Sequence, residues 1–148
     1  MGADISIVAE VRKNGKWEKA PPKMFTTEAG EAETHGEKID YPFWWRSYEM
    51  YGVLADHRRY ENHPFIRACD EWPLDAGDYE EFGSGAYAWS WATLKELLDF
   101  DYDQVLTKRG GAVTTVREFL PKHFFVNLEE LKALGEPEDV RIIFSFDN

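Results

Sequence analysis

Two segments at opposite ends of the chain alternate between apolar and other side chains, and this alternation constrains the fold more than any other feature. The apolar side chains on one side of these segments are Ile5, Ile7, Ala9 and Val11 in residues 4–12, and Val140, Ile142, Phe144 and Phe146 in residues 139–147. A period of two is typical of a β-strand with one buried face. Because each strand needs cover on that face, we expect both in one antiparallel sheet with helices packed against it.

A hairpin is predicted directly after the first strand. Asn14-Gly15 accepts positive φ at both central positions of a two-residue turn, and residues 16–19 around Trp17 can run back as the second strand. Residues 21–37 are rich in Pro, Thr, Gly and acidic side chains without periodicity, which predicts a long surface loop. At most a short edge strand is expected there, at residues 23–26.

Helices are predicted from periodicity and from capping patterns. Residues 43–60 place Trp44, Tyr48, Tyr51 and Ala55 along one stripe, which favours an amphipathic, core-facing helix. Three later helices follow a Thr or Asn that stands three residues before a Glu. These patterns are Thr93 with Glu96 before residues 94–100, Thr115 with Glu118 before Pro121, and Asn127 with Glu130 before residues 131–134 and the closing Gly135.

The remaining middle of the chain is predicted to be irregular. Residues 61–86 contain Pro64, Pro73 and several Gly, and residues 70–81 carry six carboxylates without one basic side chain. A loop of this length is often functional. Residues 86–92 fit either a strand or irregular structure. The predicted fold class is therefore α+β: an antiparallel sheet containing an N-terminal hairpin and the C-terminal strand, three to four short helices and long irregular loops.

Length and composition limit the kind of protein. A chain of 148 residues is expected to form a single globular domain, residues 1–148, with one core. The formal charge of -11 repels phosphate backbones and so disfavours direct binding of nucleic acid. The single cysteine, Cys69, excludes an intramolecular disulfide, and no apolar run is long enough to span a bilayer. Cytoplasm is the expected compartment.

No metal site, cofactor motif or complete catalytic set is visible. Asp99, Asp101 and Asp103 imitate the first ligands of a calcium-binding EF-hand loop, but Gln104 and Gly110 stand where that loop needs Gly and Glu. The histidines and Cys69 match none of the usual zinc spacings. We therefore expect a protein that binds a partner without chemistry, and an enzyme ranks third among the hypotheses.

Aromatic and cationic side chains supply a candidate ligand site. With 6 Trp, 7 Tyr and 10 Phe, some rings are expected to line a groove or a partner surface. Stacking rings together with cationic donors suit a nucleotide-like ligand. The candidate ligand-binding residues are Trp44, Trp45, Arg58, Arg59, Trp89, Trp91, Lys108 and Arg109. Adjacent side chains on a helix point about 100° apart, so one of the first two Trp is expected to be partly exposed.

Several strings resemble a family of small uncharacterised proteins from bacteriophages and bacteria. They are residues 1–11, Trp45-Arg46-Ser47-Tyr48, residues 54–58, Ser90-Trp91-Ala92-Thr93 and residues 100–103. The resemblance covers the first two thirds of the chain and brings no assigned activity. It implies a phage context, in which such proteins often counter host defence.

Two functions fit these observations. The first is a phage-type accessory protein that sequesters a small nucleotide-like defence signal. The alternative is an acidic inhibitor, or nucleic-acid mimic, that binds a host defence protein in the host cytosol; it is motivated by the charge and by the acidic run at residues 70–81. A homo-oligomer is compatible with either function.

Overall fold

The structure is a computed structural model that describes residues 3–27, 38–57, 63–67, 71–83 and 86–147. The strands are β1 (Asp4–Lys13), β2 (Lys16–Lys19), β3 (Phe25–Thr26), β4 (Lys38–Ile39), β5 (Tyr87–Thr93), β6 (Val105–Thr107), β7 (Val113–Thr115) and β8 (Val140–Asp147). The helices are α1 (Tyr48–Ala55), α2 (Leu94–Asp99), α3 (Val116–Phe119) and α4 (Lys122–Lys132), and a 3-10 turn, η1, spans Pro137–Asp139. The α+β class is confirmed.

The main sheet joins the two ends of the chain, as the alternation predicted. Within the described residues its strand order is β2-β1-β8-β5, and all neighbouring strands are antiparallel. Asn14 and Gly15 have φ of 52° and 79°, the positive values that the predicted hairpin turn requires. The pairing of β1 with β8 runs from Asp4↔Asp147 to Val11↔Val140, so the two end segments form the centre of the sheet.

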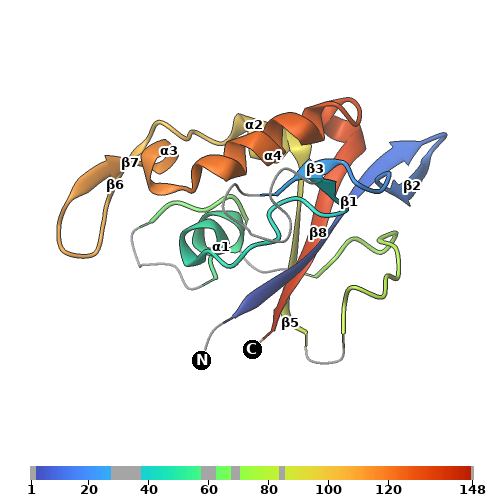
Figure 1. Ribbon diagram of the computed structural model, residues 1–148, viewed down its shortest axis with the longest axis horizontal. Coiled ribbons are helices and arrows are strands. Elements are labelled where there is room, and N and C mark those ends of the chain that lie inside the picture. Colours follow the sequence, from blue (N-terminus) through green and yellow to red (C-terminus); the bar gives the residue numbers. More distant parts are fainter. Residues whose placement is uncertain (1–2, 28–37, 58–62, 68–70, 84–85, 148) are drawn as a thin grey trace.

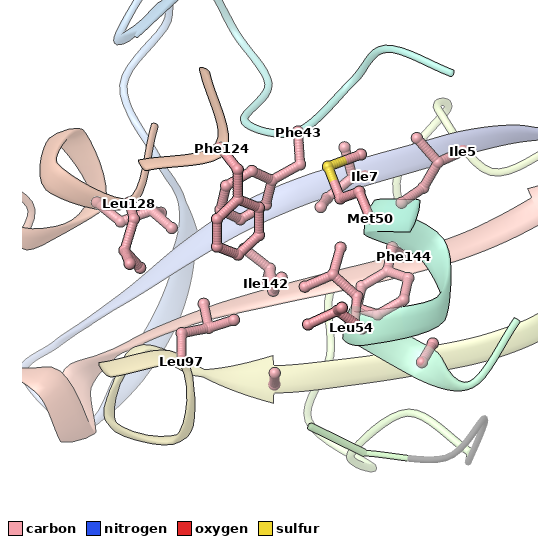
Figure 2. Packing of buried hydrophobic residues seen from close by; sticks show 14 of the residues in the cluster. Ile5, Ile7, Phe43, Met50, Leu54, Leu97, Phe124, Leu128, Ile142 and Phe144 are labelled. Atoms are coloured by element: carbon pink, nitrogen blue, oxygen red, sulfur yellow. The ribbon is translucent and has the colours of Figure 1, made fainter. Parts of the chain in front are cut away.

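One face of this sheet is covered by helices, and the core lies between them (Figure 1). Ile7 on β1 and Phe144 on β8 are opposite one another and buried on this face. Figure 2 shows Phe43 and Phe124 side by side above these strands, and their rings stack at 4.6 Å between centroids. The segment of residues 71–83 runs along the other side of the sheet in Figure 1, and we call it the covering segment.

The predicted helix at residues 43–60 is shorter than expected. α1 begins only at Tyr48, because the Ser47 side chain accepts the Met50 amide as an N-cap and Phe43 has a positive φ of 51° that no helix accommodates. The helix ends at Asp56, whose φ of 60° is left-handed. Of the predicted stripe, Tyr51 and Ala55 are buried and Tyr48 is 36% exposed.

Two of the three capping patterns are confirmed, and the third is wrong. Thr93 with Glu96 forms a full capping box, and the Thr115 side chain accepts the Glu118 amide. Asn127, by contrast, lies inside α4, which begins at Lys122, five residues before Asn127. Its buried side chain accepts the Phe43 amide at 2.9 Å, so it supports a neighbouring loop instead of capping a helix.

Candidate functional site

The face of the main sheet opposite the helices, here called the outer face, carries polar and aromatic contacts outside the core. Because paired residues share a face, the register Ile7↔Phe144 on the core side places the alternate pairs on the outer face. The side chains of the outer face include Ser6, Val8, Glu10, Arg12, Trp17, Lys19, Trp91, Arg141, Ile143 and Ser145. Val8 and Ile143 are buried there, so the outer face is covered rather than bare.

A buried ion pair fastens the covering segment to the outer face. Glu10 is 0% exposed and accepts hydrogen bonds from Arg141 Nε at 2.8 Å, the Tyr79 hydroxyl at 2.7 Å and the Gly77 amide at 3.1 Å. Arg141 also donates to the carboxylate of Asp75 at 3.0 Å and to its backbone carbonyl at 3.3 Å. Three contacting residues belong to the covering segment, so the pair connects the sheet to a part of the chain without regular structure.

The Tyr79 hydroxyl is held neutral by this arrangement. Burial and the hydrogen bond to Glu10 raise the pKa of Tyr79 well above its ordinary value. A Cβ atom on Gly77 would lie 2.4 Å from the Tyr79 ring, so this close approach of the two residues requires glycine. The contact therefore depends on both side-chain chemistry and backbone fit.

A second ion pair connects the covering segment to β2. The Lys19 ammonium donates to the Glu81 carboxylate and lies 5.6 Å from the centroid of the Tyr41 ring. The hydrogen bond to Glu81 raises the pKa of Lys19. Burial disfavours the charged form of Glu81, but hydrogen bonds from Lys19, from its own backbone and from Tyr41 outweigh that effect and lower the pKa of Glu81.

Trp17 on β2 is flanked by two arginines that also have acidic partners. The Arg141 guanidinium lies 3.9 Å from the centroid of the Trp17 ring and that of Arg12 lies 5.2 Å away. Arg12 pairs with Asp139 at 2.6 Å. Both cations that contact this ring are therefore already neutralised by carboxylates.

A β-bulge brings two tryptophans to the outer face. Tyr87 pairs with Phe146 and Ser90 with Phe144, so β5 holds one extra residue, and Ala88 there has φ of 55°. Tyr87 consequently turns to the core side, where its hydroxyl contacts His57 at 3.2 Å. After the bulge, Ser90 is buried on the core side, and Trp89 and Trp91 face outward.

Trp72, Phe82 and Trp89 form an aromatic cluster at this bulge. The rings of Trp72 and Phe82 are 4.4 Å apart between centroids, and those of Trp72 and Trp89 are 6.3 Å apart. The Trp72 indole also donates to the Phe144 carbonyl at 3.0 Å, which fixes its position on the sheet. Trp89 is 45% exposed, and Leu74 in the covering segment is fully exposed. The cluster is thus an anchored apolar surface open to solvent.

Arg67 stacks on the ring of the neighbouring Trp91. Its guanidinium lies 4.0 Å from the centroid of the Trp91 ring, and its Nη2 donates to both carboxylate oxygens of Glu96 at 2.6 Å. Glu96 also closes the capping box of α2, so it fixes the arginine against a helix N-terminus. Arg67 Nε is buried and has no hydrogen-bond partner among the described residues.

The structure separates the predicted ligand-binding residues. Trp45 is buried on the core side, where it packs against His123, whereas Trp91 lies on the outer face. Trp44 is partly exposed, as expected for one of the two adjacent Trp. Lys108 and Arg109 lie in the turn of the β6–β7 hairpin, at the far end of the molecule from the covering segment (Figure 1). Arg58 and Arg59 lie outside the described residues.

Sequence reasoning found Trp89 and Trp91 but missed the residues that contact them. Arg67 and Trp72 contact them directly and Phe82 packs on Trp72; all three come from segments without periodicity, where a pattern assigns no direction to a side chain. The signal that was available is the acidic run of the covering segment, since carboxylates there can reach Arg141 and Lys19 on the sheet. The three carboxylates that imitate an EF-hand loop each accept a hydrogen bond within the protein. The donors to Asp99, Asp101 and Asp103 are Lys95, the Asp103 amide and Arg117, respectively.

Comparison with known proteins found no matching family model, no matching curated protein and no matching solved structure. The resemblance to phage proteins therefore stays a prediction. None of the helices in the described parts of the chain is long and apolar enough to cross a membrane. The described residues also contain no group of three or more His, Cys, Asp or Glu side chains that could hold a metal ion.

Proposed function

We propose that this protein binds a basic partner protein through the aromatic cluster and the covering segment, and that it acts without chemistry. The observation that carries this proposal is the pairing of charges on the outer face. Arg141, Lys19 and Arg67 each contact a ring, and each already has a carboxylate partner. A phosphate would have to displace one of these carboxylates, whereas a cationic partner would not.

The surface around the cluster favours the same kind of partner. Asp78 and Glu80 are exposed on the covering segment, and exposed Trp89 and Leu74 offer apolar anchors. Large apolar anchors at the centre of an interface contribute most of its binding energy, and a charged rim directs association. The resemblance to phage proteins supports a host defence protein as the partner, in agreement with the acidic-inhibitor hypothesis.

The test compares two charge reversals that change the net charge of the protein by the same amount. Immobilised wild-type protein, Glu80→Lys and the control Glu129→Lys are exposed to host lysate, and any retained protein is purified and titrated. Glu129 lies on α4 with 71% of its side chain exposed, so its reversal changes the same charge elsewhere on the molecule. We expect Glu80→Lys, but not Glu129→Lys, to abolish retention of a basic protein at physiological salt.

Trp89→Ala provides the quantitative readout with the purified partner. Removal of an anchor residue costs at least about 2 kcal/mol, so the dissociation constant should rise by roughly 30-fold or more. If both charge reversals weaken binding equally, or if Trp89→Ala leaves the dissociation constant unchanged, the partner does not use this surface and the proposal fails.

A small nucleotide-like ligand is the second candidate, and one observation favours it. Arg67 stacks on Trp91 and its Nε lacks a hydrogen-bond partner among the described residues, so a phosphate or carbonyl oxygen could complete its contacts. Titration with a panel of linear and cyclic nucleotides distinguishes the two functions. Binding that Arg67→Ala weakens by roughly 10-fold or more would favour the nucleotide hypothesis.

A further inference from the structure

The β6–β7 hairpin projects from the body of the molecule at the end opposite the covering segment (Figure 1). Its strands pair with the register Val105↔Thr115, Leu106↔Thr114 and Thr107↔Val113. At the tip, the Lys108 amide donates to the Ala112 carbonyl at 2.7 Å and the Gly111 amide to the Lys108 carbonyl at 3.0 Å. Gly110 has a positive φ of 96°, which this turn requires and glycine adopts without strain.

The hydrogen-bond pattern leaves one edge of β7 open. In an antiparallel pair, hydrogen-bonded and non-hydrogen-bonded pairs alternate. The Val116 amide donates to the Gln104 carbonyl and the Lys108 amide to the Ala112 carbonyl, so the backbone groups of Val113 and Thr115 point away from β6. Within the described part of the chain, nothing pairs with the N–H groups of these two residues.

The opposite edge of the hairpin differs, because a side chain already contacts it. On β6, the Thr107 carbonyl lies 2.7 Å from Nε2 of His63. His63 itself is buried against Phe119 of α3. The hairpin therefore has one edge anchored to the body and one edge, that of β7, facing solvent.

One face of the hairpin also carries exposed apolar surface. Val105 and Val113 are 64% and 67% exposed, and the register places them on the same face of the hairpin. β-branched residues are typical of paired strands, and an exposed edge rich in them tends to pair with another strand. The buried face, by contrast, has Leu106 in the core.

Charge along the hairpin is asymmetric. Lys108 and Arg109 lie at its tip, in a protein whose formal net charge is -11. At its base, Asp103 is paired with Arg117, and exposed Asp101 and Glu118 add negative charge. Two hairpins placed antiparallel would bring each cationic tip toward the acidic base of the other.

We propose that the β7 edge pairs with the β7 edge of a second copy of this chain, in an antiparallel arrangement with twofold symmetry. Val113 of each copy would exchange two backbone hydrogen bonds with Thr115 of the other, giving four in all, with Thr114 on the symmetry axis. The edge is self-complementary in both register and charge, and this identifies a second copy as the occupant. The inference is independent of the proposed partner-binding surface, which lies on the outer face.

The matched variants Val113→Pro and Val105→Pro test this arrangement in the full-length protein. Each removes one N–H that points away from the other strand, so neither breaks a hydrogen bond inside the hairpin. Sedimentation velocity is measured from about 10 µM to about 1 mM protein. Because the dimer loses two of its four hydrogen bonds, Val113→Pro should weaken dimerisation by roughly 5- to 150-fold, whereas Val105→Pro should leave it unchanged.

A charge-reversed variant and amide hydrogen exchange test the same dimer without a proline substitution. Lys108→Glu with Arg109→Glu should weaken the dimer and reduce its sensitivity to salt between about 0.05 M and about 0.5 M. In the wild-type protein, the Val113 and Thr115 amides should exchange more slowly as protein concentration rises. A protein that is monomeric over the whole range, or a dimer that both proline variants weaken equally, would overturn the proposal.

Discussion

Removal of the Glu10 carboxylate tests how strongly the covering segment is held. Glu10→Ala leaves three donors without their acceptor: the buried Arg141 Nε, and the partly buried Tyr79 hydroxyl and Gly77 amide. The bond from the buried guanidinium is worth about 1.5–3 kcal/mol. The bonds from Tyr79 and Gly77 also go to the charged carboxylate, but both residues are only partly buried, so each is taken at about 0.5–1.5 kcal/mol. Because Arg141 keeps Asp75 as a partner, we expect a total loss of about 3–5 kcal/mol in the free energy of unfolding.

Urea unfolding at neutral pH, followed by tryptophan fluorescence, measures this loss. Asp75→Ala is the control: its carboxylate contacts the same Arg141 but the side chain is 65% exposed, so the cost should stay below about 1 kcal/mol. Replacing Glu10 and Arg141 together by Met should cost less than Glu10→Ala alone, since no buried charge is left unpaired. Limited proteolysis should cut the covering segment faster in Glu10→Ala. A loss under about 1 kcal/mol for Glu10→Ala would refute a structural role for the pair.

Two further outcomes are expected. Asn127→Leu should lower the free energy of unfolding by about 2–4 kcal/mol, because it leaves the buried Phe43 amide without an acceptor; thermal or urea unfolding measures the loss, and a change below about 1 kcal/mol would contradict it. The raised pKa of Tyr79 contributes stability that is fully present below pH 10.0, the ordinary tyrosine value, and is lost as pH rises through the folded value. Above pH 10.0, the free energy of unfolding should therefore fall less steeply in Tyr79→Phe than in the wild type. Parallel curves for the two proteins would contradict a contribution of Tyr79 to this pH dependence.

The sheet could be predicted from the sequence because its strands are specified locally. Alternation in residues 4–12 and 139–147 fixes which side chains share a face, and Asn14-Gly15 fixes the hairpin. The α+β class follows because the apolar face of two such strands must be covered by helices. Strand order beyond the hairpin was not available from pattern alone, although the apolar faces of both end segments required a common sheet.

The errors in the helices have a common physical cause. Asn127 with Glu130 has the spacing of an N-cap pattern, but both side chains bind backbone groups of distant segments: Asn127 accepts the Phe43 amide and Glu130 accepts the Thr26 amide. Local spacing cannot distinguish a capping side chain from one that supports another loop. The same contact holds Phe43 in its left-handed conformation, which is why α1 begins later than its periodicity indicated.

The candidate site could be predicted only in part for a related reason. Trp89 and Trp91 were predicted as ligand-binding residues, yet a single inserted residue at Ala88 decides which face they occupy, and a bulge has no reliable sequence signal. Arg67 and Trp72 reach these rings from irregular segments, so their positions follow from tertiary contacts alone. Charge pairing is the reason that a basic partner is proposed ahead of a phosphate-bearing ligand, because Arg67 beside the Trp91 ring already has a carboxylate partner.

Four acidic side chains of the covering segment form two groups with different roles. Asp75 and Glu81 pair with Arg141 and Lys19 on the sheet, and so contribute to holding the segment in place. Asp78 and Glu80 lie between them in the chain and are exposed. A segment without regular structure can present a defined charged surface only if something else fixes its backbone, and here Glu10 does so through Gly77 and Tyr79, with a smaller contribution from the first group. The surface proposed for a basic partner therefore depends on acids that are already paired within the protein.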